Sequence, residues 1–244
     1  LLINASHTHC GPMIRTVRPI GKNSRPQAAY AAIPSDQAAR RVAETKEYNA
    51  RLHDTFIKLI GDCIKNLQPV KLAYNHARCG FAMNRRLPTE NGFRNSPYPD
   101  GPVDHEVPVL QLRNAKDKLL AILFGYACHN TTTGVMQFNG DYAGWAQEYL
   151  ETEHPGTVAL FVQGCGGDQN PYPRGTIDLA KKHGRTLATA VEAGLIANPK
   201  LIEGPLRAAL DYVNIDYAPP PTRAALEQKA KSPNRYDRRH AETL

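Results

Sequence analysis

Two long stretches of the chain carry apolar residues at helical spacing. One runs from residue 35 to about 67, with Ser35 as a candidate N-cap, and the other runs from about 176 to 197. The apolar stripe of the first consists of Leu52, Phe56, Ile60 and Ile64. The stripe of the second consists of Leu179, Leu187, Val191 and Leu195. Shorter helices are expected over residues 141–153 and 222–230.

Short apolar runs predict the strands. They cover residues 1–5, 70–82, 107–112, 119–127, 157–163 and 206–217. The run over 119–127 is almost wholly apolar and is expected in the centre of a sheet. Residues 84–106 are dense in Pro, Asn, Gly and Arg, which predicts a long ordered loop. Strands and helices alternate, although not regularly, so we expect an α/β fold, a mixed layered sheet-and-helix catalytic domain.

Both ends of the chain look cut. The sequence opens inside an apolar run without an initiator Met, and residues 235–244 stop without a cap or closing element. We therefore expect residues 1–244 to be the central part of a domain that is incomplete at both ends.

Composition narrows the range of partners. The 244 residues carry a formal net charge of +7, which is spread along the chain with one denser group at 235–240. Basic and aromatic residues are not interleaved, so nucleic acid is not an expected partner. No apolar run reaches the 18 or so residues of a membrane span. The five cysteines show no CxxC spacing, which argues against a zinc ribbon and a redox pair.

Three of the apolar runs lead directly into polar loops. The first run precedes His7 and His9. The run over 119–127 precedes His129, and the next one precedes a glycine-rich segment, residues 164–171. Strand ends that bring reactive groups to one edge of a sheet are the usual way in which α/β enzymes build a site. The three loops are therefore expected to contribute to one site.

The three histidines have the chemistry of a zinc site. Neutral imidazole is the commonest protein ligand of zinc, and catalytic sites use three protein ligands and one open position. Alternate residues of an extended segment point the same way, so His7 and His9 can reach one cavity. An HxH pair by itself is a weak signal, because loop histidines often make ordinary hydrogen bonds. His129, placed directly after an apolar strand, strengthens the prediction of a metal site.

The glycine-rich segment offers backbone N–H groups that no bulky side chain covers. They are candidates for binding an oxyanion, although glycine at such a place also allows a tight turn with positive φ. Asp168 either orients a histidine ligand or caps this turn. Asp141 has a similar ambiguity, and for it we favour the helix N-cap.

Two adjacent arginines, Arg85 and Arg86, follow Asn84 at the end of an expected strand. An arginine fixed beside a metal would stabilise negative charge on a carbonyl oxygen or bind an acidic substrate. Of two adjacent arginines, one is usually solvated.

Five motifs, taken in order over residues 1–175, resemble those of the neutral (alkaline, non-lysosomal) ceramidase family. They are Ser6-His7-Thr8-His9-Cys10-Gly11-Pro12, Asn84-Arg85, Ala127-Cys128-His129 with Thr131-Thr132, Gly140-Asp141-Tyr142-Ala143-Gly144, and Gly167-Asp168-Gln169-Asn170-Pro171. Because their order matches as well as their residues, the five together are far more specific than any one of them.

This resemblance implies an amidohydrolase that acts on linear amides. Its reaction would cleave the amide bond of N-acyl-sphingosine (ceramide) or a related N-acyl lipid and release a fatty acid. The resemblance also implies a secreted, periplasmic or cell-surface protein with peripheral contact to a membrane surface. The C-terminal immunoglobulin-like domain of the family would be absent from this chain.

The resemblance assigns roles to individual residues as well. His7 and His129 would bind one zinc ion, and the remaining ligands, a Glu and a Tyr, would lie beyond Leu244. His9 would handle protons or contact the substrate, and Arg85 would contact the reacting carbonyl. With ligands outside it, the chain by itself is expected to be at most weakly active.

Two positions depart from the family pattern. Cys10 replaces a serine, which is a mild change. Asn170, beside the catalytic candidate Asp168, stands where the family has a serine with a central catalytic role. An asparagine amide can donate a hydrogen bond to an oxyanion, but it is not a nucleophile and does not readily pass a proton. Either zinc-activated water suffices, or the substrate is not ceramide, or activity has been lost.

Two alternatives therefore stay open. One is a catalytically impaired lipid- or carbohydrate-binding relative, which Asn170 favours. The other is a two-metal amidohydrolase whose HxH pair ends the first strand of a closed barrel, although the sequence lacks the regular strand–helix repeat of such a barrel.

Overall fold

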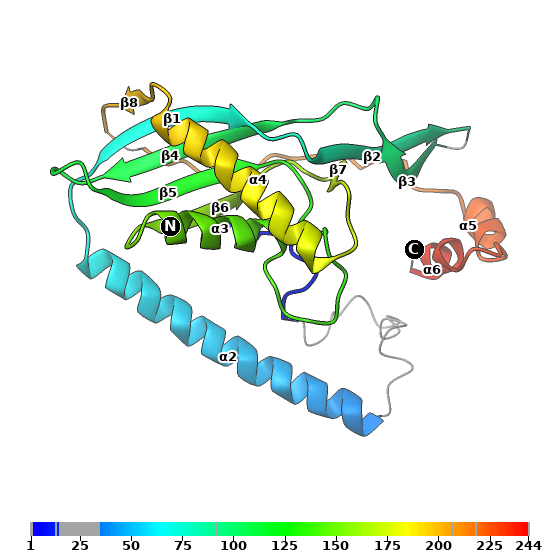
Figure 1. Ribbon diagram of the computed structural model, residues 1–244. Helices are drawn as coiled ribbons and strands as arrows, with labels where there is room; N and C mark the ends of the chain where they lie inside the picture. The colour runs from blue at the N-terminus through cyan, green and yellow to red at the C-terminus, as the bar shows by residue number, and fades with distance from the viewer. Residues whose placement is uncertain are drawn as a thin grey trace. The chain divides into compact units, whose positions relative to one another are not determined.

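The computed structural model describes residues 2–12, 14, 35–90, 92–205, 207–217 and 219–243. They fall into two compact units. Unit 1 comprises Leu1–Pro12 and Cys63–Gly204, and unit 2 comprises Met13–Asp62 and Pro205–Leu244. The helices and mixed sheets confirm the α/β class (Figure 1).

Unit 1 is built on a five-stranded sheet of order β6-β5-β4-β1-β8. Its strands are β1 (Lys71–Arg78), β4 (Glu106–Arg113), β5 (Leu119–Tyr126), β6 (Val158–Gln163) and β8 (Lys200–Ile202). β5 and β6 run parallel, and the other neighbouring strands are antiparallel. β5, which was expected at the centre, lies between β4 and β6, and β4 takes the middle position.

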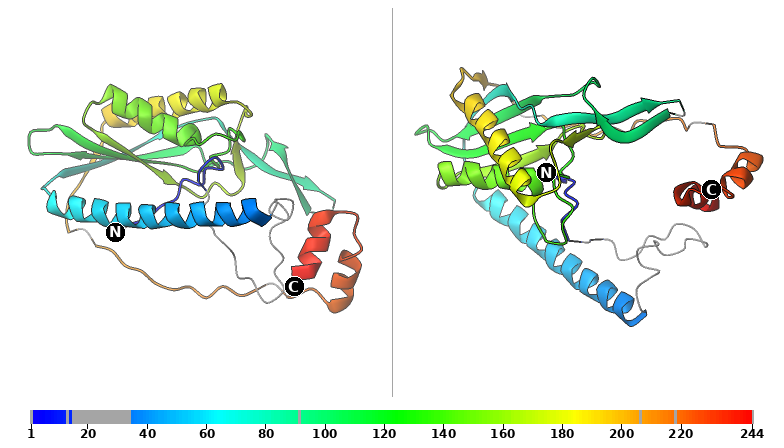
Figure 2. Two further views of the ribbon diagram at one scale, coloured as in Figure 1. Left: turned by 90° about the horizontal axis from the view of Figure 1, so that it is seen from below. Right: turned by 45° about the vertical axis from the view of Figure 1, so that its right-hand side comes forward.

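Two helices, α3 (Asp141–Glu153) and α4 (Ile177–Ile196), cover one face of this sheet (Figure 2). Both confirm the helices expected there. The side chain of Thr176 caps α4 by accepting a hydrogen bond from the N–H of Leu179. Leu187, Val191 and Leu195 of the expected apolar stripe on α4 are buried, because this face of the helix packs against the sheet.

The core of unit 1 lies between the sheet and these helices. Its largest fully buried side chains include Tyr126, Tyr142, Phe124, Ile122, Leu150 and Leu187. Each apolar side chain of this size contributes about 1.5–3 kcal/mol by burial. The two tyrosines also anchor backbone near the strand ends. The hydroxyl of Tyr126 donates to the carbonyl of Cys79 at 2.6 Å, and that of Tyr142 donates to the carbonyl of Cys128.

A second, three-stranded sheet of unit 1 has the order β3-β2-β7. It consists of β2 (Ala82–Thr89), β3 (Gly92–Tyr98) and β7 (Gln169–Pro171). The prediction of a loop over 84–106 is therefore wrong, because β2 and β3 form a hairpin there. Pro88 lies beyond the three residues of β2 that pair with β7, and Pro97 lies in β3, an edge strand. Neither proline therefore removes a backbone N–H that pairing with β7 needs.

Two expected strands do not form among the described residues. Residues 2–5 lie along the edge of unit 1 without strand pairing, and Leu2 and Ile3 are exposed. Residues 207–217 are extended and exposed, and Leu206 lies outside the described residues. The strand after α4 is instead β8, which pairs with β1. Apolar composition is not enough for a strand, because a neighbouring strand must also pair with its backbone.

The described part of unit 2 includes α5 (Arg223–Lys229), α6 (Arg235–Thr243) and α2 (Ser35–Lys65) up to Asp62, while the last residues of α2 belong to unit 1. α2 ends close to the expected boundary, and the side chain of Ser35 lies outside the described residues. Phe56 on its apolar stripe is 45% exposed, so this stripe is not a buried one.

Both sheets are open, so the described residues contain no closed barrel, which contradicts the two-metal barrel alternative. None of the described helices is both long and apolar enough to cross a membrane.

Candidate functional site

Two loops of the site meet because β5 and β6 are parallel. Tyr126 at the end of β5 pairs with Gln163 at the end of β6, so both strands deliver their next residues to the same edge. The backbone N–H of His129 donates to the carbonyl of Gln169 at 3.1 Å, and its ring Nδ1 donates to the carbonyl of Gly166. The loop after β5 is thereby fixed to the glycine-rich turn after β6.

The structure brings the three candidate histidines together at this edge. The ring centroids of His7 and His129 are 4.8 Å apart, and those of His7 and His9 are 5.0 Å apart. The Nε2 atoms of His7 and His9 are separated by 3.3 Å. Both of these histidines are exposed, whereas His129 is half-buried. The side chains therefore form one cluster that is open to solvent on one side.

His129 is held as a neutral imidazole with a defined tautomer. A backbone carbonyl can only accept, so the proton on Nδ1 is fixed by Gly166 and the lone pair of Nε2 is left free for another partner. That partner is Nη2 of Arg85, at 3.2 Å. Burial lowers the pKa of His129 most, and the hydrogen bond with Gly166 raises it, while electrostatic repulsion from Arg85 and, less strongly, from His7 and His9 lowers it further. Nε2 is therefore an acceptor at neutral pH.

His9 is also held neutral. Desolvation lowers its pKa first, although much of the side chain is exposed. The charges of His7, Arg85 and Arg174 lower the pKa further, against a smaller opposite effect of Asp141. Such a histidine can accept a proton and remains uncharged at neutral pH.

The segment that carries His7 is clamped by Asn130, to which the sequence analysis gave no role. The buried amide of Asn130 donates from Nδ2 to the carbonyl of Ser6 and to Oε1 of Gln163, the latter at 2.9 Å. Its Oδ1 accepts from the N–H of Ala143 at 3.2 Å. The next residue, His7, has a φ of 59°, a left-handed conformation that non-glycine residues rarely adopt. In the sequence, only the position of Asn130 directly after His129 could have indicated this clamping role.

The other end of this segment is tied to a buried aspartate. Sγ of Cys10 lies 3.3 Å from Oγ1 of Thr133, whose backbone N–H donates to Oδ2 of Asp141 at 2.9 Å. The interpretation of Asp141 as an N-cap is wrong, because Gly140 is the N-cap of α3 and Asp141 is its first residue. Asp141, with a φ of 53° and no exposed surface, turns its carboxylate inward to Thr133 and to the N–H of Tyr142. It supports the loop rather than acting in the cluster.

In the glycine-rich turn, Gly166 is required for close packing. A Cβ on Gly166 would lie 2.5 Å from the backbone nitrogen of Cys128, and no glycine of this turn has a positive φ, contrary to the expectation from its sequence. The N–H of Gly166 is used within the turn, where it donates to Gly164. Among the described residues no acceptor lies within reach of the N–H groups of Gly167 and Asp168, so these two remain candidates for an oxyanion.

Arg85 is fixed at both its backbone and its side chain. Its N–H donates to the carbonyl of Asp168 at 2.8 Å, and its Nε and Nη2 donate to the carbonyl of Gly167 at 3.1 and 2.8 Å. Burial lowers its pKa first and the charge of Arg86 next, while the carboxylate of Asp168 raises it. Asp168 thus faces Arg85, and the partner of the His129 ring is Gly166 instead.

Asn170 lies beside the cluster in β7. Its side chain is buried, and its Oδ1 accepts a hydrogen bond from Oγ1 of Thr131 at 3.3 Å. Its backbone pairs with Met83 of β2. Asn170 therefore supports the loop that carries His129.

The histidine cluster fits part of a zinc site. The two expected ligands, His7 and His129, have ring centroids 4.8 Å apart, so their imidazoles lie at one place. The carbonyl on Nδ1 of His129 is the usual outer partner of a ligand histidine. However, no set of three or more His, Cys, Asp or Glu side chains in the described residues is arranged to hold a metal.

Comparison with solved structures supports the fold. Over 64% of this chain it matches the crystal structure of neutral ceramidase from Pseudomonas aeruginosa, with a TM-score of 0.54 and 19% sequence identity. A ceramidase complexed with C2 matches over 57% of the chain, with a TM-score of 0.48 and 19% identity. The matches cover 27% and 24% of those chains, so this chain spans about a quarter of their length. No family model and no curated protein matches the sequence.

Proposed function

We propose that this chain is part of a zinc-dependent hydrolase that cleaves the amide bond of an N-acyl lipid and releases a fatty acid. Ceramide is the first candidate substrate. The observation that carries the proposal is the cluster of His7, His9 and His129 with Arg85 at the shared edge of β5 and β6. The fold that the chain shares with neutral ceramidase over 64% of its length supports it.

In this proposal His7 and His129 hold the zinc, together with a Glu and a Tyr outside the chain. When bound, zinc would lower the pKa of a water molecule and polarise the amide carbonyl. Nε2 of His129 has a single lone pair, which Arg85 now occupies at 3.2 Å. If His129 bound a metal through Nε2, Arg85 would give up this hydrogen bond, and its guanidinium would then be available to the oxygen of the substrate carbonyl.

The remaining groups handle charge and protons. His9 is neutral at pH 7 because its pKa is lowered, so it can take the proton of the attacking water and return it to the leaving amine. Arg85 and the N–H groups of Gly167 and Asp168 face the negative charge that develops on the carbonyl oxygen. Asn170 cannot act as a nucleophile, so water attacks the amide directly and no acyl-enzyme forms.

Metal analysis and fatty-acid release of the full-length protein test the proposal. We expect one zinc per protein, and the double variant His7→Ala, His129→Ala should lose both the zinc and the release of fatty acid from N-acyl lipids. Gln111→Ala, a change at a buried polar residue of β4, serves as the control and should retain both. A full-length protein without zinc, or a double variant with unchanged activity, would contradict the proposal.

The substitution at position 170 favours a second candidate, a lipid- or carbohydrate-binding relative without turnover. An assay of several N-acyl lipids with the wild type and with Asn170→Ser separates the two. Fatty-acid release by the wild type supports the hydrolase. Release by the serine variant alone supports the binding protein. A location outside the cytoplasm and contact with a membrane surface belong to the same proposal and depend on the lipid substrate.

A further inference from the structure

We propose that Arg85, Arg86 and Arg174 form an anion-binding subsite beside the histidine cluster, for an amide substrate that carries a carboxylate, sulfonate or phosphate near the scissile bond. The three residues are called the arginine cluster below. For the cleavage step this inference rests on the proposed hydrolase, whereas the binding of an acidic amide does not depend on turnover.

The first observation is that two guanidinium groups converge on one neutral acceptor. Arg85 donates to the carbonyl of Gly167 from Nε and Nη2, at 3.1 and 2.8 Å. Arg86 donates to the same oxygen from Nη2, at 3.3 Å. Two like charges held this close repel each other, and a carbonyl dipole offsets this repulsion far less than a full negative charge does. An anion bound between them would relieve it.

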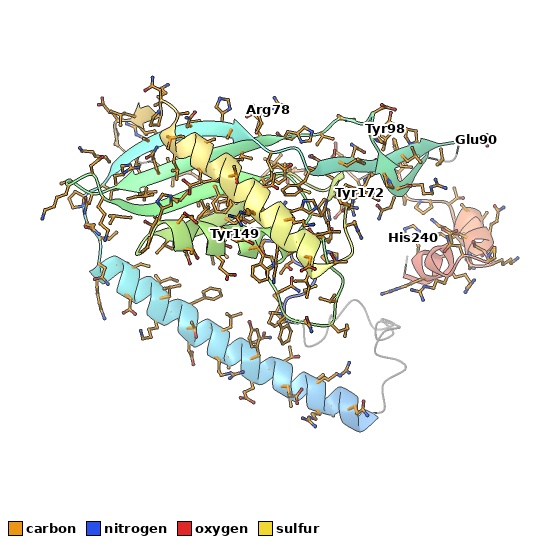
Figure 3. The ribbon with its side chains drawn as sticks, viewed as in Figure 1. Arg78, Glu90, Tyr98, Tyr149, Tyr172 and His240 are labelled. Atoms are coloured by element: carbon orange, nitrogen blue, oxygen red, sulfur yellow. The ribbon has the colours of Figure 1, made fainter. Side chains whose placement is uncertain are left out.

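The third arginine comes from a loop that is fixed next to the cluster. The N–H of Tyr172, labelled in Figure 3, donates to the carbonyl of Phe81 at 2.8 Å, and that of Gly175 donates to Thr132 at 2.7 Å. Arg174 lies between these two anchors. The residues that flank Arg174 are thereby tied to Phe81, which precedes β2, and to Thr132, in the loop that follows His129. The arginine cluster therefore combines two residues of β2 with one residue of the loop between β7 and α4.

In the part of the chain that the structure describes, the arginine cluster forms no ion pair with a carboxylate. Within the described part of the chain, no Asp or Glu oxygen lies within 4.0 Å of a guanidinium nitrogen of the cluster. Asp168 raises the pKa of Arg85 but does not form an ion pair with it, and the carboxylate of Asp141 is buried against Thr133. The site thus has the excess positive charge that an acidic ligand would balance.

One catalytic arginine is enough for the oxygen of a scissile carbonyl, so Arg86 and Arg174 are left for another group. Guanidinium groups bind carboxylates and phosphates with charge-assisted, often paired hydrogen bonds. Apart from the denser group at 235–240, the other basic residues are spread along the chain, whereas Arg85 and Arg86 share one acceptor next to His129. The geometry therefore favours an acidic N-acyl amide over neutral ceramide.

A matched pair of substrates tests the subsite in the full-length protein. N-palmitoylglycine and N-palmitoylethanolamine share the acyl chain and the amide, and they differ in a carboxylate against a hydroxyl. We expect the acidic amide to bind roughly tenfold more tightly, because its carboxylate forms charge-assisted hydrogen bonds where the hydroxyl forms neutral ones. Binding is measured by competition with a fluorescent fatty-acid amide, and cleavage by release of palmitate.

Three variants assign the preference to the cluster. Arg174→Gln and Arg86→Gln should each reduce the preference for the acidic amide by roughly fivefold and change the neutral amide little. Arg174→Lys, which keeps the charge, should retain most of the preference. Arg78→Gln removes an exposed arginine at the end of β1 (Figure 3) and should leave it unchanged. Circular dichroism checks that each variant is folded.

The outcomes separate this inference from the proposed function. Cleavage of both amides at equal efficiency supports the hydrolase and overturns the subsite. Selective binding of the acidic amide without cleavage supports the subsite and contradicts the hydrolase. If the arginine variants lose binding of the acidic and the neutral amide equally, the subsite is overturned. Binding of the variants to vesicles with 30 mol% anionic lipid is measured separately. If they lose only this binding, by roughly the contribution of surface basic residues, the cluster contacts a membrane and the subsite is overturned.

Discussion

Arg85 donates a hydrogen bond from Nη2 to Nε2 of His129, at a distance of 3.2 Å. The second ring nitrogen of His129 already donates to Gly166, so the arginine occupies the only lone pair with which this histidine could bind a metal. The proposed mechanism needs both residues, and Arg85 would compete with a metal ion for Nε2 of His129.

This competition predicts an unusual variant. Arg85→Gln should bind zinc roughly tenfold more tightly than the wild type, because it frees Nε2 and removes a positive charge next to the ion. The same variant should lose about 100-fold in kcat, since a charged partner of the carbonyl oxygen is missing. Zinc affinity is measured by titration against a chromophoric chelator. Weaker zinc binding by Arg85→Gln would show that Arg85 supports the site and does not compete with the metal.

The metal-free protein should lose stability in mild acid. His9 and His129 have lowered pKa values in the folded state, mainly through desolvation, so between those values and 6.5 the unfolded chain binds more protons. Their contribution is therefore lost as the pH falls below about 6.5. Urea unfolding with EDTA at pH 7.5, 6.5 and 5.5 measures this dependence. The double variant His9→Gln, His129→Gln should show a shallower loss, and an equally steep one would contradict the assignment.

The clamp at Asn130 should matter more for the site than its distance in sequence suggests. Asn130→Ala removes the partner of the Ser6 carbonyl, of Oε1 of Gln163 and of the N–H of Ala143, and should cost about 2 kcal/mol or more of unfolding free energy. It should also weaken zinc binding, because Ser6 directly precedes His7. Gln111→Ala, at a similarly buried amide of β4, is the matched control and should lower stability alone. Equal zinc affinity in both variants would reduce Asn130 to a purely structural residue.

Two neighbouring glycines of the turn should respond very differently to alanine. Gly166→Ala places a Cβ 2.5 Å from the backbone nitrogen of Cys128, where nothing can yield easily, and should cost about 2 kcal/mol or more. It should also displace the carbonyl that fixes the tautomer of His129. Gly167→Ala meets no atom within 4 Å and should change stability by less than about 0.5 kcal/mol. Thermal unfolding of the two variants compares them directly.

The parts of the fold that local patterns determine were predictable. α3 and α4 were expected near their actual ends, because an apolar stripe and a capping residue such as Thr176 depend on neighbours a few positions away. The hairpin of β2 and β3 was missed because its sequence is polar and rich in proline. Residues 207–217 show the opposite error, since their apolar pattern predicted a strand and no partner strand pairs with them among the described residues.

The site was predictable only as far as motifs reach. His7, Arg85 and His129 came from short motifs, and the structure brings them together. The role of Asn130 could not be foreseen, because its amide joins Ser6 and Gln163, which are 124 and 33 positions away in the chain. Contacts of this kind follow from the sheet order, which no single stretch of sequence encodes.

The segment that carries His7 and His9 belongs to no strand or helix in this structure. It is attached to the rest of unit 1 through its backbone and through a few side-chain hydrogen bonds, such as those of Asn130 and Cys10. In physical terms, residues 2–12 resemble a tethered peptide that docks onto a preformed surface, and such an attachment can open without unfolding the sheet. The half of the site on this segment is therefore held without strand pairing, whereas the half that follows β5 and β6 is fixed by the sheet. In hydrogen exchange, amides of residues 2–12 should exchange well before those of β5.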